Sequence, residues 1–262
     1  MLYFPLSRFV GEKMAGHSKW ANIKHKKAAN DKKRAKVWTK VIREITVAAR
    51  EGNTSDPNAH PRLRLAVDKA LATNMPKDTT ERACKRGAGE TDGANYEEIR
   101  YEGYGPGGIA VLADCMTDNR NRTVSEVRHA FTKAGGNLGT DGSVSYMFKK
   151  IGSILYDSGA DEEAIMEIAL EAGAEDISSD EDGSIELITS PENFTAVISK
   201  LREANHEPIA AEITMRADLL TPVDADTAEK LLRLIDVLED LDDVQDVHFN
   251  ADFPDEVLEA MG

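Results

Sequence analysis

Residues 151–215 carry the pattern that most restricts how this chain can fold. Apolar residues alternate there between strand and helix spacing, and the Asp182-Gly183 pair is typical of a tight hairpin turn. The expected elements are a strand at 154–156, a helix at 162–172, strands at 174–178 and 185–189, a helix at 191–204 and a strand at 209–215. This βαββαβ order predicts a ferredoxin-like domain.

Residues 14–90 predict a different unit, a basic three-helix bundle. Apolar side chains recur there at three- and four-residue steps, which gives each helix one buried stripe. Pro61 suits the first position of the second helix. Asp78 and Glu81 have the spacing of a capping box at the start of the third helix, and Gly87 is expected to end it.

The spacing of apolar residues changes to that of strands after residue 94. Glu98, Arg100 and Glu102 alternate with apolar neighbours, which predicts a half-exposed strand. The glycines of 103–108 precede a strand and lack the spacing of a phosphate-binding loop, so they predict a hairpin turn.

A helix and a further strand are expected next along the chain. Thr123 and Glu126 have capping-box spacing for the helix, and Val144, Tyr146 and Phe148 alternate as the strand.

The last predicted helix and strand, at 225–241 and 244–249, have no partner of their own. We therefore expect them to complete the sheet begun at 95–150, so that 95–150 plus 216–250 form one discontinuous domain with 151–215 inserted in it. The predicted fold is a multidomain α+β protein, in which the bundle precedes two ferredoxin-like α+β domains, one inserted in the other. Residues 1–13 are expected to be a dispensable extension, and their apolar run is too short to span a bilayer.

Charge is distributed very unevenly along this chain. The formal net charge is −15, but residues 1–90 hold 20 basic and 9 acidic side chains, whereas residues 151–262 hold 5 basic and 30 acidic ones. The stretch 16–36, GHSKWANIKHKKAANDKKRAK, has eight Lys and Arg side chains against one acid, Asp31. Such a cationic block is typical of a surface that neutralises phosphates, although a solvated helix face or a basic tail has the same composition.

The candidate nucleic-acid-binding residues follow from this block and from a second cluster of arginines near residue 120. They are Lys19, Trp20, Lys24, His25, Lys26, Lys27, Lys32, Lys33, Arg34, Lys36, Arg120, Arg122 and Arg128. Trp20 either stacks on a base or fills a core. The three arginines either meet phosphate at a helix start or pair with Asp118 and Glu126.

Other chemistries find little support in the sequence. The six histidines and two cysteines show no zinc-site spacing, and the acidic run 239–246 lacks the spacing of a calcium loop, so it is interpreted as a solvated helix end. Ser143 lacks a nucleophile elbow, and neither catalysis nor a metal or cofactor is expected. Two separated thiols fit a reducing cytoplasm.

Four motifs in this chain resemble one known family. They are the block at 16–36, YEGYGPGG at 101–108, DNRNRTVSEVRHAF at 118–131 and GGNLGTDGSVSYMF at 135–148. They occur in the order found in the YebC family, and the resemblance runs from Met14 to the end of the chain.

The resemblance implies a DNA-binding regulator of transcription. It equally implies a second function, because mitochondrial relatives are similar to translational activators and bacterial ones to ribosome-associated translation factors. The partner is therefore expected to be DNA, ribosomal RNA or the ribosome, and not a membrane. A third hypothesis is a magnesium-dependent nuclease that uses Asp114, Asp118 and Asp141.

Overall fold

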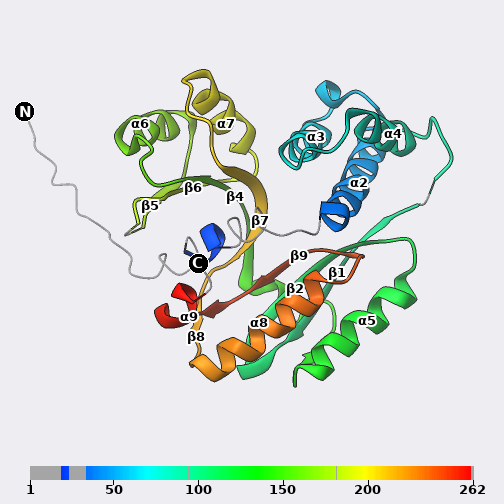
Figure 1. Ribbon diagram of the computed structural model, residues 1–262, viewed down its shortest axis with the longest axis vertical. Coiled ribbons are helices and arrows are strands. Elements are labelled where there is room, and N and C mark those ends of the chain that lie inside the picture. The colour runs from blue at the N-terminus through cyan, green and yellow to red at the C-terminus, as the bar shows by residue number, and fades with distance from the viewer. Residues whose placement is uncertain (1–18, 24–33, 94, 181, 261–262) are drawn as a thin grey trace, which may run out of the picture.

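The computed structural model describes residues 19–23, 34–93, 95–180 and 182–260. Figure 1 shows a helical bundle beside two sheets, each of which carries two long helices on one face. The fold is a mixed α+β architecture, as predicted. Among the described residues, no helix combines the length and apolar content needed to cross a membrane.

The bundle consists of α2 (Arg34–Glu51), α3 (Pro61–Ala72) and α4 (Lys77–Gly87). Pro61 opens α3 and Gly87 ends α4, as the sequence predicts. The predicted capping box of Asp78 and Glu81 is wrong. Pro76 occupies the N-cap position of α4 and offers no side-chain acceptor, so Asp78 lies inside the first turn.

The core of the bundle is formed by apolar side chains from all three helices, and Ile45, Leu63 and Ala66 are fully buried there. Helices α2 and α4 approach closely because Gly87 has no side chain. A Cβ atom at Gly87 would lie 2.3 Å from the carbonyl oxygen of Thr46.

The first sheet contains β1 (Glu97–Tyr104), β2 (Ala110–Thr117), β3 (Asn137–Leu138) and β9 (Val244–Phe249), in the order β3-β1-β2-β9. All three pairings are antiparallel, and β9, from the C-terminal part of the chain, pairs with β2. Helices α5 (Arg120–Lys133) and α8 (Ala225–Glu239) cover one face. Phe131, Leu231 and Val247 belong to the core between them.

The second sheet contains β4 (Phe148–Tyr156), β5 (Asp176–Ser179), β6 (Ile185–Thr189) and β7 (Ala210–Ala217), in the order β5-β6-β4-β7. Helices α6 (Glu162–Ala172) and α7 (Phe194–Glu203) pack on one face over a separate core. The observed element order is therefore β4-α6-β5-β6-α7-β7, with every pairing antiparallel.

The strand predicted at Val144–Phe148 is wrong. Residues Ser145–Met147 form a short 3-10 helix, and Phe148 opens β4 in the second sheet. The reason is that the Glu102 carboxylate accepts the backbone N–H groups of Val144 and Ser145, which removes them from strand pairing.

Smaller elements join the two sheets. Strands β8 (Thr221–Pro222) and β10 (Ala251–Asp252) pair in parallel, and α9 (Asp255–Glu259) follows. A further small core of Ala110, Leu112, Val144, Phe148 and Ala217 lies where the sheets meet. The two sheets therefore share packed side chains as well as chain connections.

Candidate nucleic-acid interface

Most of the predicted cationic block lies outside the described residues: Lys24, His25, Lys26, Lys27, Lys32 and Lys33. Arg34 opens α2, and only its backbone is described. The structure therefore describes the two ends of the block and the arginines of α5.

The N-terminal end of the block packs against the first sheet. Residues 19–23 are helical, and the Trp20 ring lies 5.2 Å from the ring of Phe249 and 5.4 Å from that of Phe253, measured between centroids. Lys19 Nζ lies 2.8 Å from Asp255 Oδ1. Of the two roles considered for Trp20, its position supports core packing, because the ring is in contact with two aromatic neighbours.

The other end of the block docks on the C-terminus of α8. Lys36 Nζ lies 3.1 Å from Asp240 Oδ1 and also donates to the Asp240 carbonyl oxygen. Lys40 Nζ donates to the Glu239 carbonyl at 3.0 Å. Because the last carbonyls of a helix carry partial negative charge, both lysines stabilise this contact. Lys36, predicted as a phosphate contact, is therefore engaged with α8.

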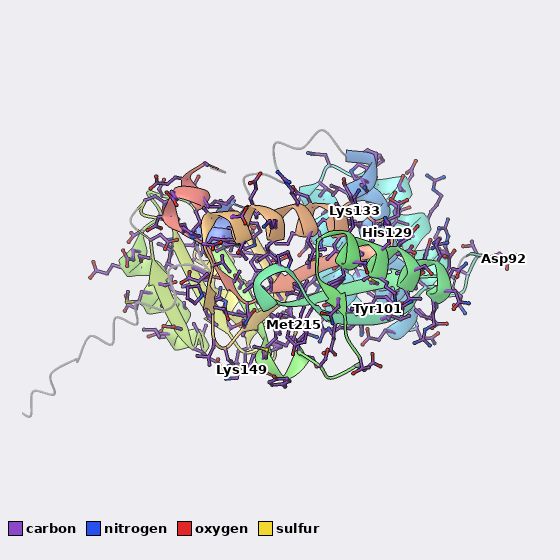
Figure 2. All side chains as sticks on the ribbon, turned by 90° about the horizontal axis from the view of Figure 1, so that it is seen from below. Asp92, Tyr101, His129, Lys133, Lys149 and Met215 are labelled. Carbon is purple, nitrogen blue, oxygen red and sulfur yellow. The ribbon has the colours of Figure 1, made fainter. Side chains whose placement is uncertain are left out.

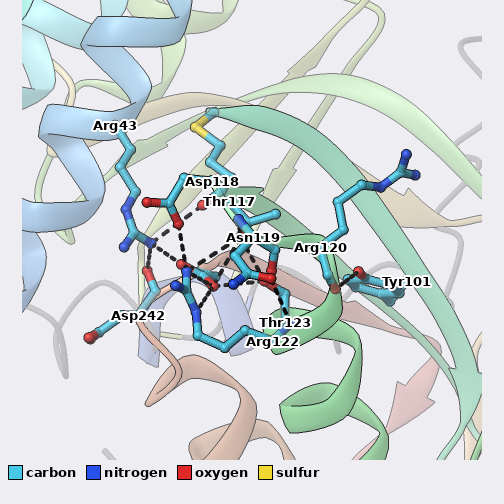
Figure 3. A network of polar contacts seen from close by, with 11 residues as sticks. Arg43, Tyr101, Thr117, Asp118, Asn119, Arg120, Arg122, Thr123 and Asp242 are labelled. Carbon is cyan, nitrogen blue, oxygen red and sulfur yellow. Dashed lines mark hydrogen bonds and ion pairs between the residues drawn. The ribbon is translucent and has the colours of Figure 1, made fainter. Parts of the chain in front are cut away.

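A buried carboxylate, that of Asp243, ties the bundle to the first sheet at the same junction. Figure 3 labels its partners Arg43, Thr117, Arg122 and Thr123. The Asp243 side chain is only 2% exposed, and Arg43 of α2 places Nη1 2.9 Å from its Oδ1. Arg122 of α5 donates to Oδ2 at 2.6 Å. The hydroxyl groups of Thr123 and Thr117 donate to the same oxygen at 2.7 and 3.1 Å.

These contacts determine the ionisation of Asp243. Burial would raise the pKa of the carboxyl group, but hydrogen bonds from Arg122 and Thr123, together with the charge of Arg43, outweigh burial and lower the pKa below its usual value. Asp243 is thus held as an anion between two guanidinium groups.

Arg122 is committed to this junction. It also donates to Asp118 Oδ1 at 2.9 Å, and these hydrogen bonds raise the pKa of its guanidinium group. The predicted capping box of Thr123 and Glu126 is wrong, because Asn119 caps α5 by accepting the Arg122 backbone N–H at 3.1 Å. Pairing with Asp118, which the sequence left open, is therefore one of the roles of Arg122.

Arg120 and Arg128 lie on the exposed side of α5. The Arg120 side chain is 67% exposed and its Nε lies 3.8 Å from Glu97 Oε2, a distance at which the ion pair leaves the cation accessible. Figure 2 shows His129 and Lys133 on the same helix, in the view from below. The outer side of α5 is therefore cationic, and Lys133 is a member that the sequence analysis missed.

Helix α4 carries a second set of cations that the sequence analysis missed. They are Lys77, Arg82, Lys85 and Arg86. Asp78 and Glu81 are the acids of this helix, so the basic residues outnumber them. The excess could have been found by comparing the charge of each predicted helix separately, instead of looking for runs of lysine.

The acids of the nuclease hypothesis do not form a metal site. Arg100 binds Asp114 with Nε and Nη2 at 2.6 and 3.0 Å, and Asp118 pairs with Arg122. Within the described residues there is no group of three His, Cys, Asp or Glu side chains arranged to hold a metal ion. Asp114 and Asp118 therefore neutralise arginines of the fold.

Comparisons with known proteins identify close relatives of the chain. Residues 18–90 match the model described as TACO1/YebC protein N-terminal domain, and residues 96–251 match the model described as TACO1/YebC second and third domain. A "probable transcriptional regulatory protein" of Thioalkalivibrio sulfidiphilus is 65% identical over 248 residues, which cover 95% of this chain and 99% of the relative. One of Francisella tularensis subsp. novicida is 62% identical over 249 residues, which cover 95% of this chain and all of the relative.

A solved structure is also similar. The crystal structure of a conserved hypothetical protein from Aquifex aeolicus is 46% identical in sequence, with a TM-score of 0.82. The match covers 90% of this chain and 98% of the other. The architecture described above is thus shared with a relative of nearly the same extent.

Proposed function

Because the chain belongs to the TACO1/YebC family, we propose that it is a non-enzymatic regulator of gene expression that binds nucleic acid through backbone phosphates. The observation that carries this proposal is the cationic block at 16–36, with eight Lys and Arg side chains against one acid. Cations that meet phosphates release condensed counterions, and this release favours binding without any base contact.

The ends of the block support the proposal because both are joined to the folded body. Trp20 packs on the first sheet, and Lys36 pairs with Asp240 at the end of α8. The exposed cations of α5, Arg120 and Arg128, would add phosphate contacts next to this junction. Trp20, Lys36 and Arg122 serve mainly to hold the interface in place.

We propose DNA as the first target, since the relatives carry the name "probable transcriptional regulatory protein". The block is rich in lysine and has few of the Arg, Asn and Gln side chains that read base edges. We therefore expect contacts that position the protein on the duplex and add little sequence preference.

Salt dependence tests this function. If about six phosphates are neutralised, the affinity for a DNA duplex should fall roughly a thousandfold between about 50 and 200 mM salt. Fluorescence anisotropy of an end-labelled duplex measures the dissociation constant at each concentration. An affinity that does not change with salt would contradict phosphate binding.

Ribosomal RNA is a second candidate target. The specific observation in its favour is that the described cations outside the block lie on two separate helices, α4 and α5, and not along one helix that could enter a major groove. Structured RNA is recognised largely by shape and phosphate contacts, which suits such a distribution. Co-sedimentation with ribosomes, compared with recovery on promoter DNA from the same lysate, separates the two targets.

The domain layout expected from the sequence remains our proposal. Residues 14–90, 95–150 plus 216–250, and 151–215 would act as the three folding units. The pairing of β9 with β2 supports a discontinuous middle unit. The second sheet begins at Phe148, so we propose that the inserted unit starts there and not at residue 151.

A further inference from the structure

Tyr146 is the most exposed of the large apolar side chains in the described part of the chain, at 74%. It lies in the short 3-10 helix Ser145–Met147, between the two sheets. The Asp218 backbone N–H donates to the Met147 carbonyl at 2.9 Å, so these two segments lie side by side. Leu219, which follows Asp218, is 64% exposed. An exposed aromatic ring of this kind can stack on a nucleic-acid base.

The loop that carries Tyr146 is held in shape by a buried carboxylate. Glu102 is 6% exposed, and its oxygens accept the backbone N–H groups of Gly142, Val144 and Ser145 at 2.9, 2.9 and 2.8 Å. Tyr104 donates its hydroxyl to the Ser143 carbonyl at 3.1 Å.

Two further features fix the backbone on the N-terminal side of the ring. Val144 is fully buried, and Gly142 adopts a φ of +80°, a conformation that favours glycine. Burial of a carboxylate is unfavourable unless it is fully hydrogen-bonded, and the backbone N–H groups of this loop supply the hydrogen bonds to Glu102. The backbone that carries Tyr146 is therefore pre-organised, and little backbone conformational entropy would be lost when a ligand contacts the ring.

The charge near Tyr146 differs from that of the rest of the C-terminal half. Lys149 lies three residues after Tyr146 and is exposed, whereas residues 151–262 hold only 5 basic side chains against 30 acidic ones. Lys149 Nζ lies 3.0 Å from Asp218 Oδ1, an exposed pair that salt or phosphate can displace.

We propose that Tyr146 is a stacking platform for an unpaired base, with Lys149 meeting a neighbouring phosphate. This inference rests on the proposed function, and it adds that the bound nucleic acid presents a single-stranded segment. Bases of every kind stack on an exposed aromatic ring, and a nearby lysine can meet the backbone phosphate. One aromatic ring and one leucine form a smaller patch than the roughly 800 Å² per partner of a stable protein interface, which favours a base over a protein.

Substitution of Tyr146 tests the platform. We expect Tyr146→Ala to weaken binding of a short end-labelled oligouridine by about tenfold or more, because stacking on one aromatic ring has an effect of that order. Tyr146→Phe keeps the ring and should bind like the wild type. Leu170→Ala, which removes another exposed apolar side chain, 54% exposed on α6, is the matched control and should also bind like the wild type.

A DNA duplex of equal length separates the possible outcomes. The Tyr146→Ala variant should bind the duplex as the wild type does, because paired bases cannot stack on the ring. If the Tyr146→Ala variant binds oligouridine with wild-type affinity, base stacking on Tyr146 is overturned and the proposed function is left intact. The same result is expected if Tyr146 contacts a protein partner instead of a base. An equal loss for strand and duplex would likewise overturn stacking. A wild-type protein that binds neither probe would overturn the proposed function itself.

Photo-crosslinking gives an independent readout. Oligouridine that contains 5-iodouridine crosslinks to aromatic side chains on which the base stacks, and mass spectrometry identifies the peptide. We expect the crosslink on the peptide that contains Tyr146 and its loss in Tyr146→Ala. Crosslinks found only on other peptides of a protein that binds the strand would contradict the assignment.

Discussion

Asp243 shows how much one side chain can do in this protein. Its carboxylate forms ion pairs with Arg43 of the bundle and with Arg122 of α5. A single buried side chain therefore joins two parts of the molecule. The acidic run 239–246 predicts a solvated helix end from sequence, and that prediction is wrong for this residue. Nothing in the run distinguishes the buried aspartate from its exposed neighbour Asp242, because burial depends on where α2 docks.

Replacement of Asp243 by asparagine should destabilise the protein. The two guanidinium groups would keep their charges and lose the anion between them, and breaking a buried ion pair in this way costs about 3 kcal/mol in free energy of unfolding. Urea denaturation followed by circular dichroism measures the change. Asp242→Asn is the matched control, because only the backbone carbonyl of Asp242 binds Arg43. Equal stabilities of the two variants would contradict the role assigned to Asp243.

The same pair of variants has a predictable pH dependence. The pKa of Asp243 is lower in the folded state than the value of about 3.9 expected in the unfolded state. Its carboxylate therefore stabilises the fold above that value, and the stabilisation is lost as the pH falls through the folded-state pKa. The difference in free energy of unfolding between Asp242→Asn and Asp243→Asn should shrink between about pH 7 and about pH 3.

At the scale of elements, local signals predicted the helices and turns better than the contacts between them. Pro61 and the hairpin at Asp182-Gly183 lie where expected, because proline and glycine act through their own backbone. Thr123 and Glu102 were misinterpreted, because their partners Asp243 and Val144 are distant in sequence. From a single sequence, a threonine that caps a helix cannot be distinguished from a threonine inside the helix that hydrogen-bonds to an acid distant in sequence.

The candidate site was predictable to a similar degree. The cationic block is visible in composition alone, and so are the arginines of α5. The engagement of Lys36 with α8 and of Trp20 with Phe249 depends on tertiary packing, which no local pattern indicates. The exposure of Tyr146 was likewise hidden, since alternation with Val144 and Phe148 predicted a strand.

The loop held by Glu102 should loosen when the carboxylate becomes an amide. In Glu102→Gln the side chain keeps one acceptor oxygen for three N–H groups and turns a donor toward them. We expect hydrogen exchange at Gly142, Val144 and Ser145 to accelerate by about tenfold or more, since loss of one such hydrogen bond is worth about 1.5 kcal/mol. Glu98→Gln, on the exposed part of the same strand, is the control. Unchanged exchange in Glu102→Gln would show that the loop does not depend on the carboxylate.

At the scale of the whole molecule, charge separates the ends of the chain. Basic residues prevail in residues 1–90 and acidic residues prevail in 151–262, so a polyanion would attract one end and repel the other. The junction around Asp243 connects the bundle to the first sheet and thereby relates the basic end to the exposed cations of α5. The protein is therefore expected to approach nucleic acid in one orientation.

Phosphate binding by the cationic block is tested most directly by the salt dependence of nucleic-acid affinity after the lysines between residues 24 and 33 are replaced by glutamine. The variant changes Lys24, Lys26, Lys27, Lys32 and Lys33, and the control changes the same positions to arginine. We predict that the glutamine variant binds a DNA duplex and a ribosomal RNA fragment more weakly, by about a hundredfold or more at low salt. The slope of log affinity against log salt should become shallower by about 0.9 for each lost DNA phosphate contact. The arginine variant should bind like the wild type. A glutamine variant that keeps both the affinity and the slope of the wild type would contradict the claim that these lysines bind nucleic-acid phosphates.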